Sequence, residues 1–311
     1  MPDDPRLEPA LARVWPGRET VVVPIEAGIT NRNYRVDVHD ETFVLRLAGT
    51  DTELLGIDRA AEVEAGRVAA EAGVGPEVCA FEPDLGCIVT RFVGGDPIPE
   101  DVLGNEDVMR SVVASIRAIH ASRPIRATFP VFRIVEGFRD TAAARGVRVP
   151  ADYVEAHAVA ARIEDAFAAA PAPFTTSHND LLNANFLLEG EHTWIVDYEY
   201  AGMGDPFFDL GNLSINNGLD DDAQALLLRT YFDDVHDVHR ARLALMRIVS
   251  DLREAMWGVV QQAISTLDFD YVGYADRHFD RLLANATDAR LPDWLIAASV
   301  PVQLTKTQPS Q

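Results

Sequence analysis

The most informative segment of the chain is Ser177-His178-Asn179-Asp180-Leu181-Leu182-Asn183-Ala184-Asn185-Phe186, followed after a short interval by Trp194-Ile195-Val196-Asp197-Tyr198-Glu199. Phosphoryl transfer needs such a set, with one carboxylate to orient and deprotonate the attacking hydroxyl and other oxygens to bind Mg²⁺. Asp180 suits the base, Asn185 and Asp197 suit the metal, and His178 is expected to brace the loop. Each residue alone is more often a turn or cap residue. The joint pattern predicts a phosphotransferase site.

The composition narrows the class of protein. The chain has 311 residues, of which 48% are hydrophobic and 24% charged, as in ordinary globular proteins. It carries 49 acidic and 27 basic residues, giving a formal net charge of -22. That balance argues against a nucleic-acid binder, which needs a basic surface. Its only lysine is Lys306, so a mechanism with a buried catalytic lysine is excluded.

The cysteines and the apolar runs bear on the compartment. Cys79 and Cys87 lie eight residues apart, outside any Cys/His cluster, so we expect free thiols, and the sequence leaves open whether they ever pair. The N-terminus has no apolar signal core, and no run approaches the roughly 18 apolar residues of a membrane span. We therefore expect a cytoplasmic protein without a membrane span.

The order of expected elements predicts an α+β chain with two lobes. The first part is expected to form a small sheet with one helix. The expected strands are Thr20–Ile25, Asn33–Val38, Thr42–Leu47, Glu77–Phe81 and Cys87–Phe92, and the expected helix is Asp51–Ala72. After a linker at Gly94–Pro97 the sequence is mainly helical, over Asn105–His120, Arg133–Arg145, Ala151–Ala170, Asp221–Phe232, Val238–Ser265 and Tyr271–Ala286. A loop and two short strands are expected within Pro171–Gly204. The boundary falls between 1–93 and 94–311, and ligands commonly bind between such lobes.

One face of the long expected helix has the composition of an amine-binding wall. Glu254, Trp257 and Gln261 follow at i, i+3 and i+7, beside a purely apolar stripe. An acid, an indole and an amide suit an ammonium head group through charge and cation–π attraction. The Tyr198–Tyr200 segment could close the opposite wall. The alternative is that the aromatic residue belongs to the core, as most such residues do.

Several segments together resemble the choline/ethanolamine kinase-like branch of the aminoglycoside-phosphotransferase, protein-kinase-like superfamily. The resemblance is carried by Gly28–Tyr34, Val44–Leu47, His178–Asn185, Val196–Gly202 and Asp205–Asn212. It implies a bilobal protein-kinase-like fold, with 1–93 as the nucleotide-binding lobe and 94–311 as the helical lobe that holds the catalytic loop and the acceptor site. It also implies ATP and Mg²⁺ as cofactors and a small amino alcohol, choline or ethanolamine, as acceptor.

The resemblance explains the scarcity of lysine. Kinase-like folds usually hold the nucleotide phosphates with a strand lysine paired to a helix glutamate, and here the matching strand position is Arg46. A permanently charged, planar guanidinium can take over that role. Its implied partner is Glu62, because Glu64 is two positions further along the helix and points to another face. Without the resemblance, a surface charge at a strand edge would be the simpler interpretation of Arg46.

The resemblance also implies the rest of the nucleotide site. Gly28, Thr30 and Asn31 lie in the turn that covers the phosphates, although Gly/Asn turns are common in hairpins. The backbone of the strand that ends at Phe92 and Val93 is implied to bond adenine, with one of these side chains packing nearby.

The acceptor side and the loop support complete the implied site. Asp209 is implied to accept backbone N–H bonds from the catalytic loop, and its ordinary alternative is a helix N-cap. The resemblance places a helix tryptophan and acidic residues around the amine, which corresponds to Trp257 and Glu199, with Tyr200 and Glu254 beside them.

Other interpretations stay open at this point. The same fold could phosphorylate an aminoglycoside or another hydroxylated metabolite, and a catalytically silent nucleotide-binding scaffold is the rival of another class. A homodimer is compatible with the sequence, and the tail over residues 287–311 has no readable role.

Overall fold

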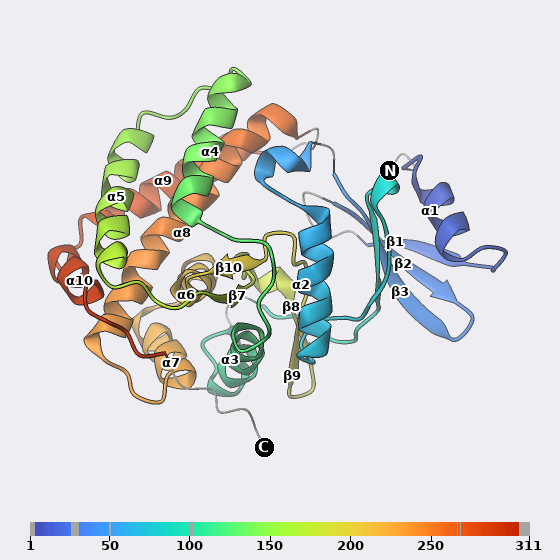
Figure 1. The fold of residues 1–311 in the computed structure, drawn as a ribbon, viewed down its shortest axis with the longest axis horizontal. Coiled ribbons are helices and arrows are strands. Elements are labelled where there is room, and N and C mark those ends of the chain that lie inside the picture. Colours follow the sequence, from blue (N-terminus) through green and yellow to red (C-terminus); the bar gives the residue numbers. More distant parts are fainter. Residues whose placement is uncertain are drawn as a thin grey trace.

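The computed structural model of the chain describes residues 4–25, 31–49, 51–99, 102–265, 267 and 269–304. A five-stranded sheet lies on one side of the molecule and a larger helical part on the other, as Figure 1 shows. This arrangement confirms the predicted α+β fold with an antiparallel sheet and a mainly helical remainder. The lobe boundary at residue 93 stays a prediction.

The large sheet has the strand order β1-β2-β3-β5-β4, and its neighbours are antiparallel throughout. Its strands are β1 Val21–Ile25, β2 Arg32–Val38, β3 Glu41–Leu47, β4 Val78–Glu82 and β5 Cys87–Arg91. Alternate residues such as Val36, Leu45 and Val89 are buried on one face. That face packs against α1 (Leu7–Val14) through Leu11 and the following Trp15. The expectation of a single helix before residue 94 was wrong. The acidic, proline-rich N-terminal segment also forms a short helix, whose apolar side packs against the sheet.

Helix α2 (Arg59–Glu71) follows a 3₁₀ turn at Thr52–Leu55 and begins where the Asp58 side chain accepts the N–H groups of Ala60 and Ala61. This cap explains why the expected helix over 51–72 starts later than predicted. The buried face of α2 includes Ala65, Val68 and Ala69, and these residues belong to the apolar core of the helical part, separate from the core between α1 and the sheet.

The helical part is built around α8 (Asp237–Ile264), which is buried along most of its length. The helices around it are α3 Glu106–His120, α4 Val131–Ala144, α5 Tyr153–Ala169, α6 Pro206–Asn216, α7 Asp221–Tyr231, α9 Tyr271–Ala286 and α10 Leu291–Ala298. Of these, α6 and α10 were not predicted, and α10 gives structure to part of the tail. Helix α6 is capped by Asp205 and packs directly against α8. The two helices are so close at Gly211 that a Cβ there would stand 2.7 Å from the Met246 carbonyl carbon.

Short strands frame the catalytic segment between the two parts. The described structure has four of them here in place of the two predicted, namely β7 Thr175–Ser177, β8 Phe186–Glu189, β9 His192–Ile195 and β10 Gly202–Gly204. β7 pairs with β10, and β8 lies between β9 and the two-residue strand β6 Asp96–Pro97. The expected linker at 94–97 therefore contributes a strand. The extra pairs were missed because segments of three or four residues carry too little alternation to be recognised.

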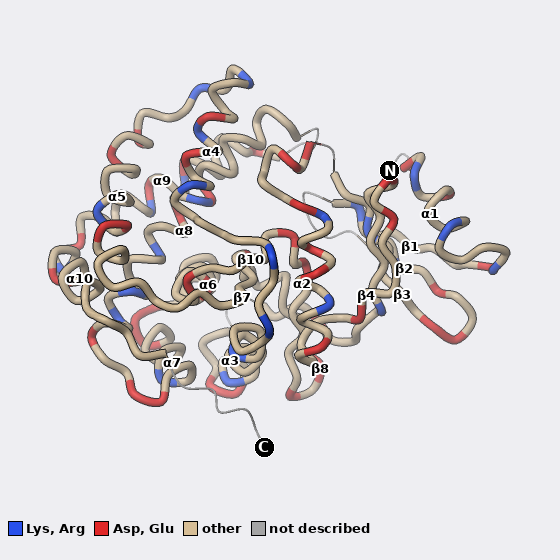
Figure 2. Tube along the Cα trace, in the orientation of Figure 1, with Lys and Arg blue, Asp and Glu red and all other residues tan. Residues whose placement is uncertain are grey.

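The distribution of charged residues and the state of the two cysteines agree with what the sequence indicates. Figure 2 shows acidic segments spread over the sheet and the helical part, interspersed with basic ones. Cys79 is exposed and Cys87 is buried, and both are free thiols. Among the residues that the structure describes, none of the helices has the length and apolar character needed to cross a membrane.

Candidate active site

The loop after β7 is held by Asp209 of α6. Its two carboxylate oxygens accept the backbone N–H groups of His178 at 2.9 Å and Asn179 at 2.6 Å. One of them also contacts His120 Nε2 at 2.9 Å. Burial alone would raise the pKa of Asp209, but these donors hold it below its ordinary value. The backbone contacts are those predicted for Asp209, and the N-cap role belongs to Asp205.

His178 has a defined protonation pattern. Its Nε2 lies 3.0 Å from the Val196 carbonyl oxygen, which can only accept, and its Nδ1 lies 3.3 Å from the Asp180 N–H, which can only donate. The ring is therefore neutral, with its proton on Nε2. Burial lowers the pKa of His178, consistent with a neutral ring. These contacts suit the bracing role predicted from the sequence and leave His178 without a free nitrogen for proton transfer.

Asp180 lies between β7 and β8, and its side chain faces α8. Its side chain is 14% exposed, and Oδ1 accepts a hydrogen bond from Arg253 Nη1 at 3.2 Å. Burial raises the pKa of Asp180 to about 7, although Arg253 acts in the opposite direction. A carboxylate with a raised pKa is better matched to accept a proton near neutral pH than an exposed one.

The two predicted metal ligands stand at adjoining ends of β8 and β9. The Val196 N–H donates to the Asn185 carbonyl oxygen at 3.0 Å, so Asn185 and Asp197 are brought side by side. The Asn185 amide donates to the Asp180 carbonyl oxygen at 2.8 Å, which ties this pair to the base. Asp197 has a φ of 67°, a left-handed conformation uncommon for residues other than glycine.

Asn185 and Asp197 fit a Mg²⁺ ion that is shared with substrate and water better than a metal ion bound entirely by protein ligands. Within the described ranges, no three His, Cys, Asp or Glu side chains gather closely enough to hold an ion by themselves. Mg²⁺ is commonly held by one or two side-chain oxygens together with substrate phosphates and water. The Asp197 side chain is 33% exposed and can reach such a ligand.

Arg46 projects from β3 toward the catalytic segment, where it contacts both Glu62 of α2 and Asp197. Glu62 also accepts from Arg59 Nη1 at 2.7 Å. The Arg46–Glu62 pair is the one predicted from the sequence. Glu64 faces elsewhere, since its carboxylate accepts the Arg126 N–H at 3.2 Å.

A second arginine, Arg59, binds Glu199 to the sheet side. Its Nη1 lies 3.1 Å from Glu199 Oε2, its Nη2 lies 3.2 Å from Asn31 Oδ1, and the Asn31 amide donates to Glu199 at 2.9 Å. The Glu199 carboxylate is therefore engaged by Arg59 and Asn31, and its place in the acceptor wall stays a prediction. Gly28 and Thr30 lie outside the described residues.

The sheet face that carries Arg46 also presents apolar side chains. Val23 and Val44 stand on either side of Arg35 across β1, β2 and β3, in the row next to Arg46. The Phe92 ring is 40% exposed and has the Arg35 guanidinium 5.2 Å from its centre. Val93, half-buried, follows it. A flat, uncharged base could cover such a surface while its phosphates extend toward Arg46.

Tyr200, Glu254 and Trp257 do gather on the other side of Asp180. Trp257 Nε1 donates to the Tyr200 hydroxyl at 2.9 Å, and the Trp257 ring centre lies 5.5 Å from that of Tyr274. The Tyr274 hydroxyl donates to Glu254 at 2.9 Å, and Arg253 donates to its other oxygen at 2.6 Å. Burial opposes ionisation of Glu254, yet Arg253 keeps its pKa below the ordinary value. Glu254 is therefore ionised and already balanced within the protein.

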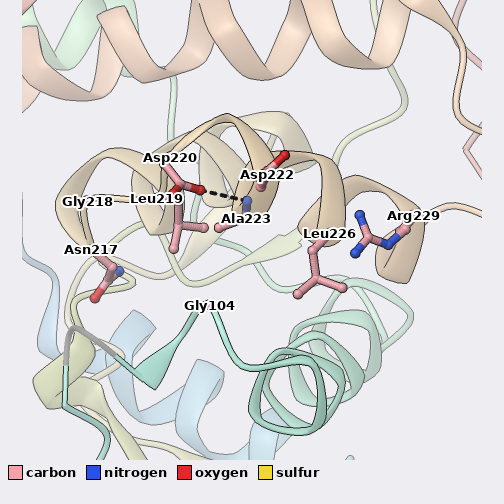
Figure 3. A pocket seen from close by; sticks show the side chains of 9 residues that line it. All are labelled: Gly104, Asn217, Gly218, Leu219, Asp220, Asp222, Ala223, Leu226 and Arg229. Carbon is pink, nitrogen blue, oxygen red and sulfur yellow. Dashed lines mark hydrogen bonds between the residues drawn. The ribbon is translucent and has the colours of Figure 1, made fainter.

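A pocket of about 350 Å³ lies apart from this wall, beside the start of α7 (Figure 3). Its lining includes Asn217, Asp222 and Arg229. The Asn217 amide donates to the Leu181 carbonyl oxygen at 3.0 Å, which connects the rim of the pocket to the catalytic loop.

The family model of the phosphotransferase enzyme family (APH) matches residues 21–246, about three quarters of the chain. The chain belongs to this family. Ethanolamine kinase 1 of Mus musculus is 24% identical to this phosphotransferase, over 90% of the chain and 88% of its own length. A choline/ethanolamine kinase family protein from Mesorhizobium loti is 29% identical, with a TM-score of 0.81 and coverage of 94% and 99%. Choline kinase LicA from Streptococcus pneumoniae shares the fold, with a TM-score of 0.78 at 19% identity and coverage of 90% and 96%.

The protein is therefore a phosphotransferase with an alcohol group as acceptor, and it is similar to choline and ethanolamine kinases. Sequence reasoning did not identify every polar residue of this phosphotransferase that contacts the site. Arg59 stands three positions before Glu62, a helical spacing that signals contact. Arg253 and His120 gave no such signal, because their partners Asp180 and Asp209 are distant in sequence.

Proposed function

We propose that this phosphotransferase moves the γ-phosphoryl group of ATP to the hydroxyl of a small amino alcohol, choline or ethanolamine. The observation that carries the proposal is the position of Asp180, which lies between two different surroundings. On one side are Asn185 and Asp197, with Arg46 beyond them. On the other is the aromatic and acidic wall around Trp257, connected to Asp180 through Arg253.

The nucleotide side has a division of roles. Arg46 would hold the ATP phosphates, and the apolar face near Val44 and Phe92 would cover adenine. Asn185 and Asp197 would hold Mg²⁺, which when bound neutralises charge on the transferred phosphoryl group. Asp180 orients the acceptor hydroxyl and takes its proton as the bond to phosphorus forms.

The acceptor side supports a small cationic alcohol over a large polycation. Trp257, Tyr271 and Tyr274 supply aromatic rings, whose faces attract ammonium groups. The one carboxylate in this wall, Glu254, is already paired with Arg253, so the aromatic rings would carry the recognition, whereas an aminoglycoside would need several separated carboxylates. The ethanolamine and choline kinase names of the relatives agree with this class.

The test is an ADP-release assay with ATP and Mg²⁺ against choline, ethanolamine, an aminoglycoside and a no-acceptor control, with product identified by mass spectrometry. We expect turnover with choline or ethanolamine that D180N abolishes. If only the aminoglycoside is phosphorylated, the proposed amino-alcohol acceptor is wrong and the acceptor is an aminoglycoside. Absence of turnover with every acceptor, from protein that binds ATP, would favour a silent scaffold.

A further inference from the structure

We infer that Arg253 is a positioning residue that fixes the side chain of Asp180 relative to the acceptor wall. The inference rests on the proposed function insofar as Asp180 is the base. The Arg253 side chain is 2% exposed, and its Nη1 donates both to Asp180 Oδ1 at 3.2 Å and to Glu254 Oε1 at 2.6 Å. One guanidinium thus holds the reacting carboxylate and the acid of the wall together.

The position of Arg253 is itself determined by its neighbours. Its guanidinium carbon lies 4.2 Å from the centre of the Tyr200 ring, and that tyrosine is held by Trp257. A planar cation stacked on a ring keeps its donors in fixed directions. Rotation of Arg253 would break the stack and both ion pairs at once.

Glu254 also connects Arg253 to the backbone of the catalytic loop through Asn212. Glu254 Oε1, which Arg253 contacts, lies 3.4 Å from the Asn212 amide nitrogen. The side-chain oxygen of Asn212 accepts the N–H of Leu181, the residue after Asp180. The backbone and the side chain of the base are therefore anchored to the same buried group. Arg253 uses Oδ1 of Asp180, and we assign Oδ2 to the acceptor hydroxyl.

Arg242 shows what a merely structural arginine on the same helix looks like. It is also fully buried and stacks on an aromatic ring, with its guanidinium carbon 4.4 Å from the centre of Phe167. Its donors, however, meet the carbonyl oxygens of Ala170 and Ala298 and the carboxylate of Asp205, the N-cap of α6, and they make no contact with Asp180. The two residues are matched in burial and stacking and differ in what they hold.

The kinetic test compares R253M and R253K with R242M, using the best acceptor in steady-state assays corrected for folded protein. A misdirected base loses turnover, so we expect R253M to lower kcat about 100-fold, with KM for ATP within about twofold of wild type because the nucleotide side is untouched. R253K keeps a charge between the carboxylates but loses the planar group that stacks on Tyr200, so we expect an intermediate kcat. R242M should lose thermal stability and keep its kcat within about twofold of wild type.

Three kinetic results would overturn the inference: wild-type kcat in folded R253M, an equal loss of kcat in R242M, or a rise in KM for ATP that accounts for the loss. If R253M does not fold, R253K carries the comparison, and wild-type kcat in that variant would overturn it too.

A second measurement does not depend on the acceptor. In thermal unfolding of wild type, D180N, R253M and the double variant, we expect R253M to cost less stability when Asp180 is already neutral, because fewer buried carboxylates then lose their counter-charge. Additive losses would show that the two residues are not coupled and would overturn the inference. If wild type phosphorylates no amino alcohol, the proposed function fails, while this cycle still decides whether Arg253 and Asp180 are coupled.

Discussion

The buried charges on the two sides of Asp180 are organised differently. On the nucleotide side, Arg46 extends from the sheet to Asp197, whose side chain remains 33% exposed. On the acceptor side, Arg253 and Glu254 are consecutive residues of one helix, and both side chains are almost fully buried. A partly exposed pair between separate elements can exchange its partners when phosphate and metal bind. A buried pair within one helix cannot, so it can serve to hold a geometry.

The largest expected effect is that of D180N, which removes the group between the two sides. Loss of the base should lower kcat on the order of 10³-fold, while ATP binding stays within about twofold of wild type because Arg46 and Asp197 are unchanged. Phosphoryl transfer from labelled ATP and a nucleotide titration measure the two quantities. D140N, at an exposed carboxylate on α4, is the control. Wild-type turnover in D180N would rule out Asp180 as the base.

On the nucleotide side, D197N should weaken binding of Mg-ATP by at least about 10-fold, because a neutral amide is a poorer magnesium ligand than a carboxylate. Asparagine tolerates the left-handed backbone at this position, so the fold should persist. Titration of nucleotide at several Mg²⁺ concentrations measures the effect. Unchanged affinity would remove Asp197 from the metal site and, with it, the idea that its pair with Arg46 is exchangeable.

A smaller effect is expected for E62Q. Neutralising Glu62 leaves Arg46 without its charged partner on α2, so KM for ATP should rise about 10-fold with little change in kcat. E64Q is a matched control two positions along the same helix, where the carboxylate meets Arg126 instead. Equal KM values for the two variants would show that the orientation of Arg46 does not depend on Glu62.

The smallest effect concerns pH and the brace of the loop. The folded protein keeps His178 neutral because burial lowers its pKa, so the unfolded chain binds more protons there as the pH falls below about 6.5. Stability from this residue is present above that pH and is lost below it. Thermal unfolding between pH 7.5 and 5.5 should therefore show a steeper decline for wild type than for H178Q. Parallel declines would mean that His178 is not held neutral.

The sequence predicted what depends on local pattern. Residues close together in the chain predict the five strands of the large sheet and the catalytic loop. The family motif predicts the Arg46–Glu62 pair. Helix α1 and the direction of Glu199 depend on partners far along the sequence, the sheet residue Phe43 in one case and Arg59 in the other. Arg253 belongs to the same class, since its charge is explained only when α8 lies against the catalytic loop.

The packing of α2 has a consequence for how the molecule can move and fold. Val68 and Ala69 of α2 belong to an apolar core whose members come mostly from beyond residue 93, so a fragment ending there would lack most of that core. The turn after α2 is also joined to β9, where the Ile195 N–H donates to the Val74 carbonyl oxygen at 2.7 Å. Helix α2 also packs against the sheet, because a Cβ at Gly66 would stand 3.1 Å from the Val78 side chain of β4. It is therefore attached to both parts of the molecule, so a shift of the sheet against the helical part would strain one of these two attachments and with it the Arg46–Glu62 pair.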